Sequence, residues 1–251
     1  MTKVLGGRDF WLAALRQESA TFRHAVAGAE LTSTVPSCPG WTVADLITHL
    51  GGEYGWVRGH IARGVVTAPD PTRPAPPAGA DLPGWFDEQT TALLTLLDEL
   101  DPDLPAYNWA PQGKTAGFWF RRLAHDTAVH RWDAQFATIT AEPVETKQAL
   151  DGIAEVLDTF LPAGRGRCAD DLTGVIGLVA TDAGHEFFVR QRGDGGIALL
   201  DTGTLLDDEP TERVVAAGTA SDILLVLWGR ADIDVLQVTG DERLVECLRV
   251  G

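Results

Sequence analysis

The chain has 251 residues, of which 45% are hydrophobic and 22% charged, a composition typical of a globular protein rather than a disordered or fibrous one. Acidic residues outnumber basic ones 36 to 20, giving a formal charge of -16 that disfavours nucleic acid and anionic membrane surfaces as partners. The longest apolar run, residues 223–228, is too short to span a bilayer, and the charged N-terminus lacks the apolar core of a signal peptide.

Four helices are expected in the first half of the chain, because apolar residues recur there at intervals of three and four. Thr42 followed by Asp45 has the spacing of a capping box and predicts where the second helix begins. Five prolines between Pro69 and Pro77 predict a stiff connection between helices rather than a domain linker, since two helices alone would not form a stable core. The expected helices cover residues 8–28, 43–61, 83–100 and 115–137.

The fourth expected helix has an inward-facing stripe that is interrupted by two ionisable side chains. The stripe runs through Trp119, Leu123, Asp126, His130, Ala134 and Ala137. Buried ionisable groups are costly unless they are paired or bind a metal. Asp126 and His130 are spaced i, i+4 and therefore lie one turn apart on one face, where they could chelate a metal ion or simply bond to each other. The spacing alone leaves both interpretations open.

The other histidines give weaker signals than this pair. His49 lies on the expected second helix, where a lone histidine is usually a residue at the edge of the core or on the surface. His125 points about 100° away from Asp126 around the helix and is a weaker metal-ligand candidate. Three histidines without a recognisable partner are expected at the surface, namely His24, His60 and His185.

The cysteines Cys38, Cys168 and Cys247 are odd in number and far apart in the sequence. They indicate neither a disulfide framework nor a cysteine metal site, which fits a reducing cytoplasm. We expect Cys38 and the tryptophans of the helical half to serve in packing. The sequence contains no glycine-rich phosphate loop and no nucleophile-elbow motif.

The second half of the chain changes character, and we expect it to form a separate α+β domain. The expected division is between residues 1–140 and residues 141–251, with the junction near residues 138–145. Short apolar runs separated by Gly/Asp turns are typical of an antiparallel meander. The expected strands are residues 174–180, 185–191, 197–200 and 213–216. The expected helices are residues 145–161, a helix that is capped by Ser221 or Thr219 and runs through Trp228, and residues 241–248.

Three stretches of the sequence resemble one protein family. They read CPGWTVADLITHL at residues 38–50, RRLAHDTAVHRWD at residues 121–133 and GTASDILLVLWGR at residues 218–230. In these motifs the chain is similar to the mycothiol-dependent maleylpyruvate isomerase family, and the resemblance covers nearly the whole chain. It implies an α plus α+β protein with a DinB-like up-and-down four-helix N-terminal bundle. The implied C-terminal domain is smaller and sterol-carrier-like, with an antiparallel sheet and helices.

The resemblance also implies a metal site. Its zinc would be held by His49 from the first motif and by Asp126 and His130 from the second. An arginine of the C-terminal domain is implied near the metal, and Arg230 is the candidate. The family commonly has glutamate where this chain has Asp126, which is one methylene shorter and could change metal position or affinity. Two histidines and one carboxylate leave a fourth zinc position open, as in catalytic sites.

The resemblance, together with this ligand set, implies an enzyme that uses mycothiol as thiol cosubstrate against a small electrophile. A thiol that binds zinc loses its proton, and the thiolate can add to a double bond. Rotation and elimination would then complete a cis-trans isomerisation, whereas addition or displacement alone would complete an S-transfer. We expect a cytoplasmic, actinobacterial enzyme that works as a monomer.

Two alternatives remain open at this point. In the first, zinc-bound hydroxide hydrolyses a substrate at the same open position, and activity does not depend on a thiol. In the second, the protein is not an enzyme: the metal braces the bundle, and the C-terminal domain binds an apolar ligand.

Overall fold

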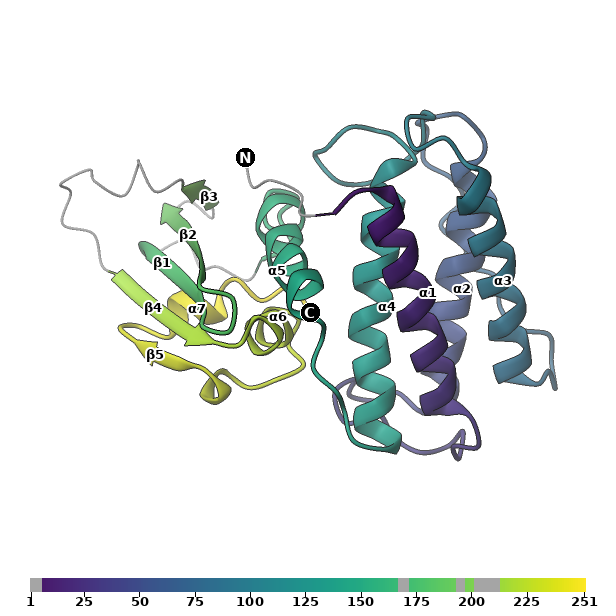
Figure 1. Ribbon diagram of the computed structural model, residues 1–251, viewed down its shortest axis with the longest axis horizontal. Coiled ribbons are helices and arrows are strands. Elements are labelled where there is room, and N and C mark those ends of the chain that lie inside the picture. The colour runs from purple at the N-terminus through teal and green to yellow at the C-terminus, as the bar shows by residue number, and fades with distance from the viewer. Residues whose placement is uncertain (1–5, 167–171, 193–196, 201–212) are drawn as a thin grey trace. The chain divides into compact units, whose positions relative to one another are not determined.

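A computed structural model describes residues 6–166, 172–192, 197–200 and 213–251 of the chain. The chain divides into two compact units at residues 142 and 143. Figure 1 shows that the first unit consists of helices and the second of a sheet with helices. None of the helices in the described ranges is both long and apolar enough to cross a membrane.

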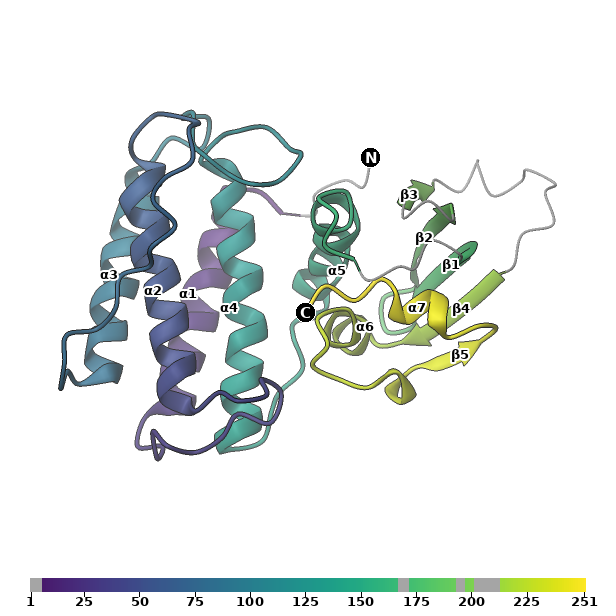
Figure 2. The same cartoon turned by 180° about the vertical axis from the view of Figure 1, so that it is seen from behind.

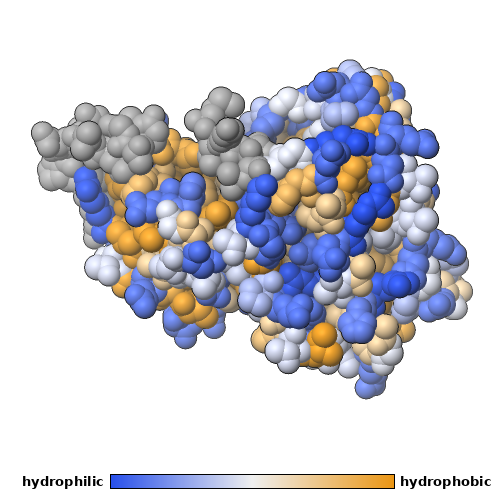
Figure 3. Space-filling view, viewed as in Figure 1, coloured by the Kyte–Doolittle hydropathy of each residue, from blue (hydrophilic) through white to orange (hydrophobic). Residues whose placement is uncertain are grey.

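The first unit is a bundle of four helices that closely match the expected ones. Their bounds are α1 Arg8–Val26, α2 Val43–Ile61, α3 Leu82–Glu99 and α4 Gly117–Thr138. The predicted capping box is confirmed, because Thr42 Oγ1 accepts from the Asp45 amide at 3.3 Å and Asp45 Oδ2 accepts from the Thr42 amide at 2.8 Å. Apolar side chains of all four helices are buried inside the bundle, while hydrophilic residues cover much of its outside in Figure 3.

The directions of the helices differ from a simple up-and-down order. Gly51 of α2 faces the ring of Trp85 on α3, and one turn further along both helices Gly55 faces Gln89. These contacts mean that α2 and α3 run parallel, so the chain has to return along α2 before α3 begins. The sequence predicted where the helices lie, but a long connection does not determine in which direction the next helix runs.

The proline-rich connection at residues 62–81 makes this return, and Figure 2 shows it running alongside α2. Arg73 Nε in the connection donates to Glu53 Oε2 of α2 at 2.9 Å. Gly52 lets the connection approach closely, because a Cβ at this position would lie 2.9 Å from the Pro74 carbonyl oxygen. The connection is therefore packed on the bundle, as expected of a segment that joins helices rather than domains.

His60 is a core residue, although we expected it at the surface with His24 and His185. Those two histidines are exposed, whereas His60 is only 2% exposed. Its Nδ1 lies 2.9 Å from the Trp56 carbonyl oxygen, and its ring packs against the ring of Trp119 at 5.1 Å. Burial lowers the pKa of His60, which favours the neutral ring. The expectation was wrong because the packing partner comes from a different helix.

The second unit begins with α5 Thr146–Glu155, which continues directly into one π-helical turn, η1 Val156–Phe160. Five strands in the described part form one sheet in the order β3-β2-β1-β4-β5. The strands are β1 Thr173–Ala180, β2 His185–Arg192, β3 Ile197–Leu200, β4 Arg213–Gly218 and β5 Gln237–Thr239. The remaining elements are α6 Ala220–Leu227, η3 Ile233–Val235 and α7 Arg243–Glu246.

The sheet is mixed rather than purely antiparallel. Strands β1, β2 and β3 form the expected antiparallel meander, with Ile176 opposite Val189 and Val189 opposite Leu199. Strand β4 pairs in parallel with β1 instead, with Val214 opposite Ile176. The residue pattern of a strand does not reveal the direction of its neighbour, so this pairing could not be predicted. Strand β5 has only three residues and gave no recognisable pattern.

The cysteines differ in state. Cys38 is a buried thiol that is not part of a disulfide, in line with the expected packing role. Cys247, directly after α7, takes part in a disulfide, so the expectation of no disulfides is wrong at this residue. Cys168 and nearly all of the turn predicted at residues 192–196 lie outside the described residues.

Candidate metal centre

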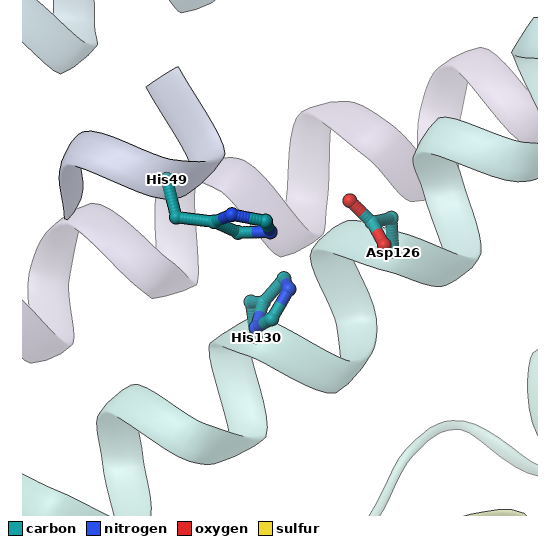
Figure 4. Close-up of side chains that lie close together, drawn as sticks. All are labelled: His49, Asp126 and His130. Atoms are coloured by element: carbon teal, nitrogen blue, oxygen red, sulfur yellow. The ribbon is translucent and has the colours of Figure 1, made fainter. Parts of the chain in front are cut away.

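His49 of α2 and Asp126 and His130 of α4 form a compact group between two facing helices. One ligand atom from each residue lies within 4.8 Å of the other two. Figure 4 shows the three side chains pointing toward one another. Imidazole and carboxylate groups are ligands that zinc and related divalent metals accept. The structure thus brings together the three residues that were expected as ligands, and their donor set fits one metal ion.

A buried hydrogen bond fixes how α2 and α4 face each other. The Tyr54 hydroxyl and Thr127 Oγ1 lie 2.6 Å apart, and both side chains are fully buried. The two helices run antiparallel, so His49, which precedes Tyr54, comes opposite His130, which follows Thr127. The ring centroids of the two histidines are 4.9 Å apart.

Asp126 is partly buried and is held by Arg122, one turn earlier in α4. Arg122 Nη2 donates to Asp126 Oδ1 at 2.9 Å, and the Arg122 side chain is 6% exposed. Burial by itself would raise the pKa of Asp126, but the charge and hydrogen bond of Arg122, together with the neighbouring His130 and His49, outweigh burial and hold that pKa below its usual value. Asp126 is therefore ionised at neutral pH, as a carboxylate ligand must be.

His130 is oriented by a second carboxylate, Asp133, to which the sequence analysis gave no role. His130 Nδ1 lies 2.9 Å from Asp133 Oδ2, and both side chains are buried. Because an ionised carboxylate can only accept, Nδ1 carries a hydrogen, and in the neutral ring Nε2 then has the lone pair that a metal needs. The i, i+3 spacing of the two residues was the signal that could have identified Asp133.

Trp41 packs against both histidines of the group. Its ring centroid lies 4.8 Å from that of His49 and 6.2 Å from that of His130, with an angle of only 17° between the planes of the Trp41 and His130 rings. We expected this tryptophan simply to pack in the core, but it is only partly buried and its neighbours are ligand candidates. His49 itself is exposed, so solvent reaches the group from this side.

Glu53 adds an acid one turn after His49 on α2, and the sequence analysis missed it. Burial and the negative charge of Asp126 raise the pKa of Glu53, while the hydrogen bond and charge of Arg73 oppose this rise. The i, i+4 spacing with His49 was the signal available for it. Acidic and arginine side chains therefore lie together close to the three metal-ligand candidates. Such surroundings favour the binding of polar or charged molecules over apolar ones.

Two further candidates are not among the three residues of this group. His125 is 1% exposed and packs its ring against Trp11 of α1, with 5.0 Å between the ring centroids. Arg230 follows α6 in the second unit, where its Nη1 donates to the Trp228 carbonyl oxygen at 2.9 Å. A role for Arg230 at the metal remains a prediction from the resemblance.

Comparison with known proteins gives matches to both units. The family model described as mycothiol maleylpyruvate isomerase N-terminal domain matches residues 12–135, and the model described as MDMPI C-terminal domain matches residues 147–246. Among solved structures, the mycothiol-dependent maleylpyruvate isomerase is similar over 95% of this chain and 96% of its own, with a TM-score of 0.62 and 13% identity. A histidine-to-alanine mutant under the same enzyme name has the same coverage, a TM-score of 0.63 and 12% identity. No curated protein matches the chain at a significant level.

Proposed function

Because this chain belongs to the mycothiol maleylpyruvate isomerase family, which is a family of enzymes, we propose that it binds zinc at His49, Asp126 and His130 and uses mycothiol as its thiol cosubstrate. The observation that carries the proposal is the convergence of these three ligand atoms within 4.8 Å of one another. We further propose that the enzyme works as a monomer in the cytoplasm of an actinobacterium, as its sequence predicts.

The proposed reaction follows from the ligand set. His49, Asp126 and His130 would hold the zinc ion, which would supply the positive charge that favours the thiolate form of a thiol bound beside it. The nucleophile comes from the cosubstrate, so no cysteine of the chain is required. The thiolate adds to the double bond of a small electrophilic acid, the new single bond rotates, and elimination returns the thiol and the trans isomer. In an S-transfer, the reaction would end after addition or displacement.

The chain's own residues keep the ligands in the form that binds a metal. Arg122 holds Asp126 in its ionised form, and the hydrogen bond to Asp133 leaves the lone pair of His130 on Nε2. For Arg230 we propose a role in binding the negative charge of the substrate, and this part of the proposal rests on the resemblance alone.

Metal analysis tests the ligand assignment directly. We expect about one zinc per chain in the wild type and loss of zinc in His49→Ala, Asp126→Ala and His130→Ala, since a site with two ligands binds zinc much more weakly. His24→Ala is the matched control, because His24 is an exposed histidine of α1. Stoichiometric zinc in the three ligand variants would refute the assignment. A wild type that neither retains nor takes up zinc would refute the metal centre itself.

Kinetic measurements test the reaction. Activity on an electrophilic acid should require added mycothiol, and activity without any thiol would favour hydrolysis instead. We expect Arg230→Ala to raise KM for an anionic substrate while zinc content stays unchanged, because an arginine that binds substrate does not hold the metal. Wild-type kinetics in this variant would remove Arg230 from the site.

A further inference from the structure

We propose that Asp133 is a positioning residue of the metal centre, which fixes the orientation of His130 and is itself held by Ser37 and Cys38. The inference rests on the proposed function, because it concerns how a ligand of the proposed zinc ion is presented. Asp133 lies one turn beyond His130 on α4, whereas Ser37 and Cys38 lie in the segment that leads into α2.

Asp133 is fully buried and accepts hydrogen bonds from three side chains. Its Oδ1 accepts from Ser37 Oγ at 2.7 Å. Its Oδ2 accepts from His130 Nδ1 at 2.9 Å and from Cys38 Sγ at 3.4 Å. A buried carboxylate is costly unless donors surround it, so these bonds account for its presence in the bundle.

The bond to Asp133 determines how His130 can act. The carboxylate takes the hydrogen of Nδ1, so Nε2 is the ring nitrogen with a lone pair for a metal. In metal sites, a carboxylate bonded in this way fixes the ring orientation and makes the histidine a stronger ligand. The Trp41 ring is nearly parallel to the ring of His130, with 17° between their planes and 6.2 Å between their centroids, and therefore covers one side of it.

The segment that holds Asp133 is itself folded into hydrogen-bonded turns. The Cys38 amide donates to the Val35 carbonyl at 3.0 Å, and the Trp41 amide donates to the Cys38 carbonyl at 3.0 Å. This turn ends at the capping box of α2, the helix that carries His49. The same few residues thus anchor Asp133 beside one ligand and begin the helix of another. Cys38 acts here as a weak donor, which is more specific than the packing role expected from sequence.

Zinc affinity, measured by competition with a chromogenic chelator, tests the proposal on the full chain. We expect Asp133→Ala to weaken zinc binding about 10–100-fold, the usual loss when a carboxylate behind a metal-bound histidine is removed. Asp133→Asn should weaken it less, because the amide oxygen can still accept from Nδ1. Glu18→Gln is the matched control: it removes another buried acid of the bundle, and its zinc affinity should equal that of the wild type.

A spectroscopic measurement separates positioning from a merely structural role. In metal-free wild type, ¹⁵N NMR of the histidine rings should show His130 with its hydrogen on Nδ1, and Asp133→Ala should lose this preference. Unchanged zinc affinity in both Asp133 variants, together with loss of zinc in His130→Ala, would overturn the proposal. If Asp133→Ala fails to fold, the Asn variant carries the test. If the wild type binds no zinc, the proposed function fails, while the NMR measurement still decides whether Asp133 sets the state of His130.

Discussion

The ion pair between Glu18 of α1 and Arg131 of α4 allows a quantitative test of how burial determines the contribution of an ion pair to the free energy of unfolding. Arg131 Nε lies 2.7 Å from Glu18 Oε2, and the two side chains are only 4% and 8% exposed. Arg131 Nη1 also donates to Gln135 Oε1 at 2.8 Å and to the Glu142 carbonyl oxygen at 2.6 Å. The change Glu18→Gln keeps the size and one acceptor oxygen of the side chain but removes the charge that balances Arg131.

Removing one partner of a buried pair costs about 3–5 kcal/mol. Because glutamine can still accept a hydrogen bond, we expect Glu18→Gln to lower the free energy of unfolding by about 3 kcal/mol, the lower end of this range. The matched control is Asp87→Asn, which breaks the pair of Arg23 and Asp87 between α1 and α3. These side chains are 59% and 41% exposed, so the expected loss is about 0–1 kcal/mol.

Hydrogen exchange of peptides from α1 and α4, followed by mass spectrometry on metal-free full-length protein, reports on this unit alone. Urea unfolding of the whole chain would combine two units and is a supporting measurement only. A loss of 3 kcal/mol corresponds to exchange on the order of 100-fold faster at the most protected amides. If Glu18→Gln and Asp87→Asn accelerate exchange equally, burial does not set the strength of these pairs and the reasoning fails.

Three further changes have expected outcomes. Thr42→Ala removes the capping box of α2 and should destabilise the bundle by about 1 kcal/mol, measured by hydrogen exchange of peptides from α2. Gly52→Ala would push the Pro74 carbonyl away and should lower the free energy of unfolding by about 1–3 kcal/mol. In the control Gly59→Ala, the added Cβ meets nothing within 4 Å, so this change should stabilise α2. Equal effects of the two changes would contradict the packing argument. The lowered pKa of Asp126 means that its charge stabilises the fold above the unfolded pKa of about 3.9, and that this contribution is lost as the pH falls through the folded pKa. The stability difference between metal-free wild type and Asp126→Asn should therefore be largest near neutral pH and shrink in acid, and a constant difference would contradict this assignment.

Local features of the fold could be predicted because they depend on neighbouring residues. The periodicity of apolar residues located all four helices of the bundle, and Thr42 with Asp45 predicted the start of α2. The i, i+4 spacing placed Asp126 and His130 on one face, but only the family resemblance added His49 from another helix. The sequence of one helix was therefore enough to predict two of the three ligands, whereas the third could be predicted only from the family resemblance.

Features that depend on which segments meet in space could not be predicted in this way. The parallel directions of α2 and α3 follow from how the proline-rich connection packs, and the parallel pairing of β4 with β1 follows from the order of strands in the sheet. Asp133 stands in a motif recognised from sequence, but its role became visible only when Ser37 and Cys38 were found beside it. The presence of an aspartate in the sequence does not show whether its carboxylate is surrounded by solvent or by three hydrogen-bond donors.

The arrangement of α4 restricts how this protein can change in evolution or by engineering. Arg122, Asp126, His130 and Asp133 follow one another along one helix, each within a turn of the next. A single-residue insertion or deletion inside residues 122–133 would rotate everything beyond it by about 100° and separate a ligand from its anchor. The proline-rich connection, by contrast, can change length without altering this spacing. New chemistry at the centre must therefore arise by substitution in α4, or by changes in length confined to the segments around it.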